Sequence, residues 1–379
     1  MRQRVKAVGR RWSIKGHPAE GSCIAKGRAD WNAPIITVQT AKAVFFPLDR
    51  RLKLSKHVWS PKTIRQAVRL GTEIASFERT SQFLQELTGI SFSKSSLQRL
   101  TGELGKAAAA KEAQVARATM QVPTREDEVV WRKPPEPLSE TISVSADGVM
   151  IHLRQEGWKE VKVMSVSAVI QEADPATGTP KPTLSQHSYC AGLWDVATFT
   201  PYYWAEAYRR GVERAKTTLC INDGAVWIWN MAFQCFAQRT EILDWWHAAQ
   251  RLWAIALASL STQEAALWVQ ARQAEMASSQ LRQLFHQVRL LFPRTHPLPK
   301  TVREAVLYLF HNRQRMDYAA FRQAGFPIGS GTIESACKTV VQARMKLAGM
   351  RWSRSGATAM LTLRTLSLSN RWHELSAFF

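Results

Sequence analysis

Three carboxylates carry the clearest chemical signal in this chain. Asp147 and Asp223 each precede a glycine at the end of a run typical of a β-strand, in the segments SVSADGV and LCINDGA. Glu334 lies near the start of a basic helical pattern, in GSGTIESACK. Because these residues are far apart in the chain, only a fold can bring them together. Converging carboxylates without a Cys or His set favour a hard cation such as Mg²⁺.

Such a carboxylate set suits phosphodiester chemistry. Two Mg²⁺ or Mn²⁺ ions about 3.5–4 Å apart neutralise charge on the phosphate and activate a water or a 3′-hydroxyl. We expect Asp147, at the centre of a predicted sheet, to bridge both ions, and Asp223 and Glu334 each to complete one. Each of the three carboxylates could instead have a purely structural role. An Asp-Gly pair is a common turn, and Glu334 suits the first turn of a helix or an ion pair with Lys338.

The charge of the chain indicates the class of partner. The 379 residues include 51 Lys and Arg against 30 Asp and Glu, so the formal net charge is +21. This excess predicts a polyanionic partner, with DNA or RNA the first interpretation and an anionic membrane surface the second. We expect no membrane span and no secretory signal. The five cysteines include no C-x-x-C pair, which argues against a zinc ribbon or disulfide framework and favours a reduced, cytoplasmic setting.

The pattern from residue 141 onward predicts an α/β domain. TISVSAD, VMIHLRQ and WKEVKVMSVSAVI are expected to be three strands joined by short turns, followed by alternating helices and strands. The order β-β-β-α-β-α-β-α predicts a mixed sheet with helices on its faces, which is the ribonuclease H-like order. Asp147 is then expected to end the first strand and Asp223 the fourth. These ends are neighbours in that fold, at the edge where α/β sheets bind ligands.

The segments before this sheet are candidates for DNA binding. Residues 1–59 begin with a basic stretch that suits either a phosphate-binding arm or a solvated terminus. Residues 60–120 are expected to be helical, with two short helices around Gly89 that resemble a helix-turn-helix. Lys94 and Arg99 on the second helix are candidate DNA contacts, although any small helical bundle would show a similar pattern. Residues 121–140 contain four prolines among charged residues and predict a linker.

The remainder of the chain completes the predicted catalytic domain. Residues 141–247 are expected to form the first part of its core, and residues 248–326 an all-α insertion that leaves and returns to the sheet. Residues 327–379 would supply the Glu334 helix and a basic C-terminal segment. The apolar positions of that helix recur at helical spacing and are expected to face the core: Ile333, Ala336, Cys337, Val340 and Val341. The basic positions are candidate DNA contacts, with a solvated face as the alternative: Lys338, Arg344, Lys346 and Arg351.

Asp244 and His247 stand three residues apart where a predicted strand meets a predicted helix, in ILDWWHAAQ. Asp244 is a candidate N-cap of that helix. His247 is either a satisfied core histidine or a functional residue. The residues alone leave both interpretations open.

Several longer segments together resemble bacterial insertion-sequence transposases of the Kra type, relatives of the Mutator-like transposases. The segments are DGAVWIW, ILDWWHA, YLFHNRQRMDYAAFRQAGFPIGSGTIESACK and RMKLAGMRWS, and similar stretches run from about residue 45 to residue 372. The resemblance implies a ribonuclease H-like catalytic domain with a helical insertion before the last acidic residue. It implies a DDE triad at Asp147, Asp223 and Glu334. It also implies that a D-x-x-H signature, Asp244 and His247, lies near the catalytic centre and helps handle the DNA strands.

The resemblance thus implies a DNA transposase that cuts at the ends of its element and joins the freed 3′-hydroxyl to target DNA. We expect Mg²⁺ or Mn²⁺ as cofactor, double-stranded DNA as partner, and a homodimer or larger assembly on DNA. Two alternatives are a catalytically silent DNA-binding protein derived from a transposase and a ribonuclease H-like, structure-specific nuclease. Relatives often carry a Cys-rich, zinc-binding segment before the PLD stretch, whereas TVQTAKAVFFPLD contains no cysteine. This departure bears on end recognition more than on catalysis.

Overall fold

A computed structural model describes residues 59–120, 134–292 and 297–378, together with the backbone of three short strands nearer the N-terminus. The chain divides into two compact units, Met1–Ala107 with His373–Phe379, and Ala108–Trp372. The side chains of the predicted basic segment up to residue 58, and residues 121–133 of the predicted linker, lie outside the described residues.

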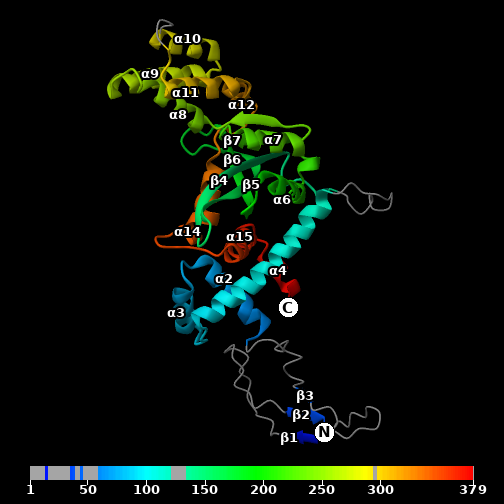
Figure 1. The fold of residues 1–379 in the computed structure, drawn as a ribbon. Coiled ribbons are helices and arrows are strands. Elements are labelled where there is room, and N and C mark those ends of the chain that lie inside the picture. Colours follow the sequence, from blue (N-terminus) through cyan, green and yellow to red (C-terminus); the bar gives the residue numbers. More distant parts are fainter. Residues whose placement is uncertain are drawn as a thin grey trace. The chain divides into compact units, whose positions relative to one another are not determined.

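A five-stranded mixed sheet forms the centre of the larger unit (Figure 1). Its strands are β4 (Thr141–Leu153), β5 (Gly157–Ala173), β6 (Pro180–Gly192), β7 (Thr217–Asn222) and β8 (Thr240–Leu243). Their order is β6-β5-β4-β7-β8. β5 is antiparallel to both of its neighbours, β4 and β6, whereas β4, β7 and β8 run parallel to one another. This sheet confirms the predicted mixed α/β class and is compatible with a ribonuclease H-like fold.

The first strand does not end at Asp147, and the prediction of a turn there is wrong. β4 passes straight through the pair, with Asp147 opposite Val163 of β5 and Gly148 opposite Lys162. The Glu160 side chain lies over this glycine, and a Cβ on residue 148 would lie 1.9 Å from its Oε1, so a larger residue would have to displace it. The two short strands predicted around the Asp-Gly pair are therefore one long strand.

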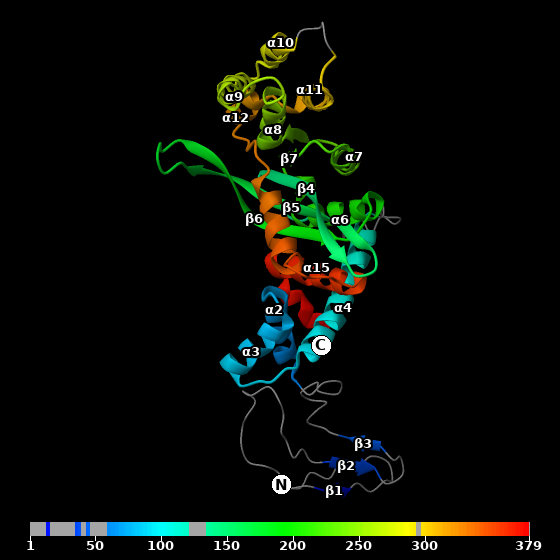
Figure 2. The ribbon, with the colours of Figure 1, turned by 60° about the vertical axis from the view of Figure 1, so that its left-hand side comes forward.

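The third antiparallel strand is β6, a segment for which no strand was predicted. It pairs with β5 from Gly192, opposite Lys162, to Pro180, opposite Ala173. Figure 2 shows the far ends of β5 and β6 projecting from the sheet as a two-stranded hairpin. The prediction of three antiparallel strands is thus correct in number, but the strands are β4, β5 and β6, because two of the predicted strands form β4 together.

Different helices cover the two faces of the sheet. On one face Ile142, Val144 and Ala146 join the apolar core with helices α6 (Val196–Arg209), α7 (Val226–Cys235) and α8 (Trp245–Ala256). The opposite face carries Ser143, Ser145 and Asp147. It is covered by a helical region that comprises α13 (Gly331–Ala336), the π-helix η4 (Cys337–Gln342), α14 (Ala343–Met345) and α15 (Arg354–Leu368). Small serines on this face leave room for the helices to approach closely.

The chain between α8 and α13 is mostly helical, as predicted, and Figure 1 shows these helices gathered at one end of the sheet. The elements are α9 (Thr262–Ala277), α10 (Leu281–Leu291), α11 (Lys300–His311), the 3₁₀ turn η3 (Arg313–Arg315) and α12 (Tyr318–Gln323). Another 3₁₀ turn, η2 (Val212–Arg214), leads into β7.

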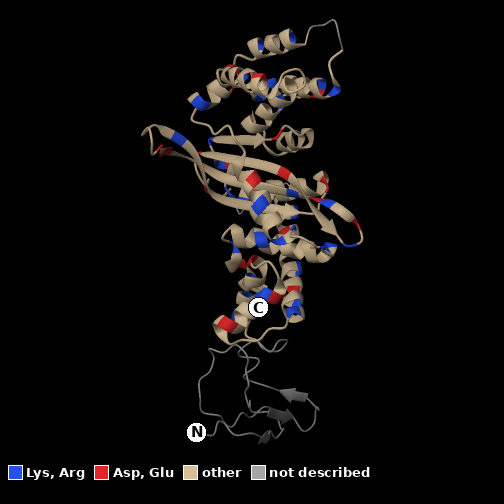
Figure 3. Cartoon of the chain, turned by 90° about the vertical axis from the view of Figure 1, so that its left-hand side faces the viewer, with Lys and Arg blue, Asp and Glu red and all other residues tan. Residues whose placement is uncertain are grey.

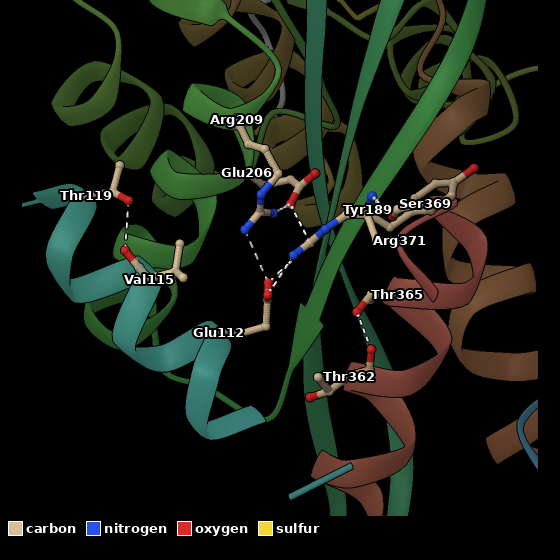
Figure 4. Close-up of polar contacts among 10 residues, drawn as sticks. All are labelled: Glu112, Val115, Thr119, Tyr189, Glu206, Arg209, Thr362, Thr365, Ser369 and Arg371. Atoms are coloured by element: carbon tan, nitrogen blue, oxygen red, sulfur yellow. Dashed lines mark hydrogen bonds and ion pairs between the residues drawn. The ribbon is translucent and has the colours of Figure 1, made fainter. Parts of the chain in front are cut away.

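A buried ion-pair network joins α4 (Lys94–Met120) to α6 and to the end of the larger unit (Figure 4). Arg371 lies 2.6 Å from Oε1 of Glu112 and 3.4 Å from Oε2 of Glu206. Arg209 pairs with the same two glutamates. Two arginines thus compensate two carboxylates that burial would otherwise penalise.

The smaller unit is helical in its described part. It contains α2 (Pro61–Glu73), α3 (Phe77–Thr88), the first turns of α4, and most of the 3₁₀ helix η5 (Trp372–Phe378). Ser60 caps α2, and Gly89 ends α3 in a left-handed conformation, both as predicted. The second helix of the predicted helix-turn-helix is not short, because α4 runs for 27 residues.

Three strands that were not predicted lie nearer the N-terminus. They are β1 (Ser13–Lys15), β2 (Ile35–Val38) and β3 (Ala43–Phe45), and they form an antiparallel sheet. Over the described parts of the chain, every helix is too short or too polar to cross a membrane.

Candidate active site

Asp147 lies in the middle of β4, half-buried, with its side chain against η4. Its Oδ1 accepts a hydrogen bond from Gly148 N at 2.6 Å, and its Oδ2 accepts one from Sγ of Cys337 at 3.6 Å. Burial raises the pKa of Asp147 and the negative charge of Asp223 raises it further, against the hydrogen bonds from Gly148 and Cys337. An added positive charge would therefore be favourable beside this carboxyl group.

Asp223 directly follows the last residue of β7, as predicted. Its Oδ1 accepts a hydrogen bond from Ala225 N at 2.9 Å, which holds the turn into α7. Gly224 between them has φ 90°, and a Cβ there would lie 2.8 Å from the Tyr308 ring. Tyr308 of α11 donates its hydroxyl hydrogen to the main-chain carbonyl of Asp223. The helical segment therefore holds the loop that carries the second carboxylate.

Asn222 connects the strands of the acidic residues. Its buried side chain accepts a hydrogen bond from Ala146 N at 2.8 Å, beyond the point where the ladder between β4 and β7 ends. Its main-chain carbonyl accepts from Asp244 N at 2.8 Å. One residue thus fixes Asp147, Asp223 and Asp244 with respect to one another.

The Asp244 carboxylate is fully buried and uses both of its oxygens. Its Oδ1 accepts from His247 N and lies 2.9 Å from His247 Nδ1, while its Oδ2 accepts from Ser330 N at 2.5 Å. The bond to His247 N is the predicted N-cap of α8. Burial raises the pKa of Asp244, but the hydrogen bonds from His247 and Ser330 outweigh it, so the pKa lies below its ordinary value.

The imidazole of His247 is oriented by this carboxylate. An ionised carboxylate can only accept hydrogen bonds, so Nδ1 of His247 carries a proton and Nε2 is left for other contacts. The hydrogen bond that His247 donates to Asp244 raises the pKa of His247 against the effect of burial, and the charges of Asp244, Asp223 and Glu334 raise it further. The side chain is 29% exposed, so a substrate can reach it.

Glu334 lies exposed in the first turn of α13, as predicted. The loop before this helix is attached to the start of α8. Trp245 N donates to the Ile328 carbonyl at 3.0 Å, and Ser330 N donates to Asp244. The position of Glu334 therefore depends on the buried carboxylate of Asp244.

The three predicted carboxylates all lie within electrostatic range of His247. Asp223 and Glu334 both act on the pKa of His247, and Asp223 and His247 both act on that of Asp147. Burial raises the pKa of Cys337, and the charges of Asp147 and Glu334 raise it further. Within the described ranges, no group of three or more His, Cys, Asp and Glu side chains is arranged to hold a metal ion by itself.

The predicted DNA contacts beside Glu334 divide into exposed and buried residues. Lys338, Lys346 and Arg351 are exposed. Arg344 is only 2% exposed, and its guanidinium lies 5.3 Å from the centre of the Trp352 ring. Burial lowers the pKa of Arg344 to about 10. The prediction that Arg344 faces solvent is wrong, because the chain beyond α14 turns back and covers it.

The two candidate contacts in the smaller unit lie on α4 in exposed ion pairs. Lys94 Nζ lies 3.5 Å from Glu78, and Arg99 lies 3.1 Å from Glu103 one turn further along the helix. Exposed pairs of this kind contribute little stability and open readily, so both cations stay accessible to a polyanion.

Sequence reasoning did not identify four residues that hold this site together. Asn222 and Ser330 carry a weak signal, since each is a polar residue beside a predicted carboxylate motif. Cys337 was expected only to face the core. Tyr308 carries no signal, because its partner is a main-chain carbonyl 85 residues away.

Comparisons with known proteins do not identify a family for this chain. No protein-family profile and no curated protein sequence matches this chain. Among solved structures, it is similar to the Drosophila P element transposase strand transfer complex with a TM-score of 0.28 and 8% identity, over 88% of this chain and 85% of that chain. A TM-score of this size does not establish a shared fold, so no property of that complex is carried over.

Proposed function

We propose that this chain is a DNA transposase with Asp147, Asp223 and Glu334 as its DDE triad. What supports the proposal is that hydrogen bonds join the elements that carry these carboxylates: Ala146 N to Asn222, Cys337 Sγ to Asp147 and Ser330 N to Asp244. The net charge of +21 supports a nucleic-acid substrate. The proposal includes a ribonuclease H-like core, with residues 248–326 as its insertion, and assembly as a homodimer or larger complex on double-stranded DNA.

The donor set fits divalent ions that need few protein ligands. Mg²⁺ is usually held by one or two carboxylates together with waters and substrate phosphates, so a closed protein cage is not required. Asp147 with Asp223 would hold one ion, and Asp147 with Glu334 a second. When bound, Mg²⁺ or Mn²⁺ supplies charge neutralisation at the phosphate and an activated oxygen nucleophile.

The remaining residues position the reacting groups. Water would attack a phosphodiester at an element end and release a 3′-hydroxyl. That hydroxyl would then attack a phosphodiester of target DNA and displace a target 3′-hydroxyl, without a covalent enzyme–DNA intermediate. Nε2 of His247 would contact a phosphate or a displaced base beside the cut: it donates when the ring is charged and accepts when it is neutral. Asp244 acts through His247 and Ser330 as a positioning residue, because its carboxylate is fully buried.

Nicking and joining assays test this proposal. Asp147→Asn, Asp223→Asn and Glu334→Gln should each abolish Mg²⁺- or Mn²⁺-dependent nicking and leave DNA binding largely intact, because each change removes a ligand charge at nearly constant volume. Asp174→Asn, in the hairpin loop between β5 and β6, is a matched control and should retain wild-type nicking. Persistent nicking by Asp223→Asn would show that the triad assignment is wrong.

Joining separates the proposal from its alternatives. A structure-specific nuclease would nick DNA but would not join a pre-cut 3′ end to a plasmid. A catalytically silent DNA-binding protein would do neither. A transposase should do both, and the triad variants should lose both.

A further inference from the structure

The β4–β5 hairpin extends past the edge of the sheet that carries the carboxylates. Pairing between β4 and β7 ends at Val144, whereas β4 and β5 stay paired as far as Leu153 and Gly157. Trp158 lies opposite His152, five residues along β4 from Asp147. At about 3.3 Å per residue, this places the Trp158 position roughly 17 Å beyond Asp147 along the strand.

Trp158 is a large apolar side chain left open to solvent at this tip. It is 57% exposed, and its ring packs edge-on against His152 with a centroid distance of 5.4 Å. The ammonium group of Lys346 lies 5.8 Å from the ring centroid. A two-stranded ribbon twists strongly along its length. Because Lys346 directly follows α14, the ring lies beside the helical region that carries Glu334, although Trp158 and Asp147 start from opposite faces of the ribbon.

The segment that follows α14 is hydrogen-bonded to the hairpin tip. Arg154 N donates to the Trp352 carbonyl at 2.9 Å, and Trp352 N donates to the His152 carbonyl at 3.0 Å. Nε1 of Trp352 donates to the Met345 carbonyl at 3.1 Å. The helical region after Glu334 and the hairpin tip are therefore one connected surface.

This connected surface is basic. Arg154, Lys346 and Arg351 are all exposed on it. The acidic residue of the hairpin turn, Glu156, is engaged by Arg354. Figure 3 shows basic residues in blue both on the β4–β5 hairpin and on the helices from Gly331 onward, which lie against the sheet. An open aromatic ring among cations is the arrangement that binds nucleic acid by stacking and phosphate contact.

We infer that the tip of the β4–β5 hairpin binds DNA, with Trp158 against a base and with Lys346 and Arg351 on phosphates. This inference rests on the proposed function, since the DNA would be the same molecule that reaches the carboxylates. A second copy of the chain is a poor occupant, because it would bring like charges together on a molecule of +21.

Binding measured without metal tests the inference apart from catalysis. The probes are a fluorescein-labelled duplex of mixed sequence and a single strand of equal length, both in EDTA. Trp158→Ala should weaken binding about 10-fold through the lost base contact, and Trp158→Phe should retain most of the affinity. Lys346→Ala and Arg351→Ala should each lower the slope of log Kd against log salt by about 1. Trp253→Ala, a part-exposed tryptophan on α8, is the control and should bind normally.

The outcomes distinguish this inference from the proposed function. A loss on the single strand alone assigns the ring to unpaired bases, and a loss on both probes assigns it to duplex; either result supports the inference. Wild-type affinity of Trp158→Ala for both DNA probes would overturn the inference. If that variant kept its DNA affinity but lost binding to phosphatidylserine vesicles, the tip would bind a membrane surface, and the inference would also be wrong. If Trp158→Ala binds weakly but the wild type never nicks, the inference stands and the transposase proposal fails. Melting curves confirm that each variant is folded.

Discussion

The buried carboxylate of Asp244 accepts a hydrogen bond from the backbone of Ser330 at 2.5 Å, across 86 residues of chain. The same carboxylate caps α8 and orients His247. Because Ser330 directly precedes the helix of Glu334, one buried charge positions both the histidine and the third carboxylate of the proposed triad. Changes at Asp244 should therefore affect chemistry at a distance from the side chain itself.

Asp244→Asn should reduce stability and nicking together. The side chain of asparagine has only one oxygen that can accept a hydrogen bond. Its NH₂ group would therefore face either the N–H group of Ser330 or that of His247, and that donor would lose its partner. We expect a loss of about 1–3 kcal/mol in the free energy of unfolding, the cost of a buried unsatisfied group. Urea denaturation and single-turnover nicking rates measure the two effects.

The control for this variant is Asp195→Asn. Asp195 caps α6 through Thr198 N at 2.7 Å and is exposed, so asparagine should replace it at a cost of a few tenths of a kcal/mol. Equal, small losses in both variants, with normal nicking, would show that Asp244 is only a helix cap.

The pKa of His247 should lie above the ordinary histidine value of about 6.5, because Asp244 stabilises the charged ring. A raised pKa in the folded state contributes stability that is fully present below pH 6.5 and is lost as the pH rises through the folded pKa. The stability difference between wild type and His247→Gln should therefore be largest at low pH within this window. NMR titration with labelled histidine measures the pKa directly, and Asp244→Asn should lower it. A titration unchanged by Asp244→Asn would contradict the assigned hydrogen bond.

Asn222 should resist replacement by an apolar residue of similar size. In Asn222→Leu the buried Ala146 N would lose its acceptor, at a cost of about 1–3 kcal/mol, and the strand of Asp147 would lose its link to that of Asp223. Asn222→Asp keeps an acceptor oxygen but adds a buried negative charge beside two carboxylates, so its stability should improve as the pH falls toward 5. Denaturation curves at two pH values separate the variants. Equal stability of Asn222→Leu and wild type would exclude this role.

The ion-pair network of Glu112, Glu206 and Arg371 should be strongly coupled. Arg371→Ala leaves the buried Glu206 and the part-buried Glu112 with Arg209 alone, and we expect a loss of up to about 3 kcal/mol. Arg214→Ala breaks an exposed pair with Glu136 and should cost less than about 1 kcal/mol. Guanidinium denaturation measures both. A double variant, Arg371→Ala with Glu112→Gln, should recover part of the loss, and additive losses would contradict the coupling.

Local patterns were sufficient for much of the fold. The alternation of apolar residues placed Ile142, Val144 and Ala146 on one face of a strand, and these residues do form the core face. Helical spacing placed Ile333 and Val340 in the core, and both are buried. Asp244 was recognisable as an N-cap from its place before WWHAAQ. These features depend on neighbours within a few residues, so the sequence alone determines them.

Where a local sequence pattern and a contact distant in the chain favour different conformations, the tertiary structure determined the outcome. Gly148 has the sequence of a turn, yet it lies within a strand, because β4 continues its pairing with β5 there, opposite Lys162. Arg344 has the composition of a solvated position, yet Trp352 covers it after the chain reverses.

The candidate site shows the same division. Carboxylates before glycine or at a helix start were visible in the sequence, which located Asp147, Asp223 and Glu334. What holds them together was not visible, because Asn222, Tyr308 and Ser330 act through hydrogen bonds that span 76 to 86 residues. A hydrogen bond to a main-chain group imposes no residue type on its partner. Such bonds leave no pattern in the sequence, and only the folded chain reveals them.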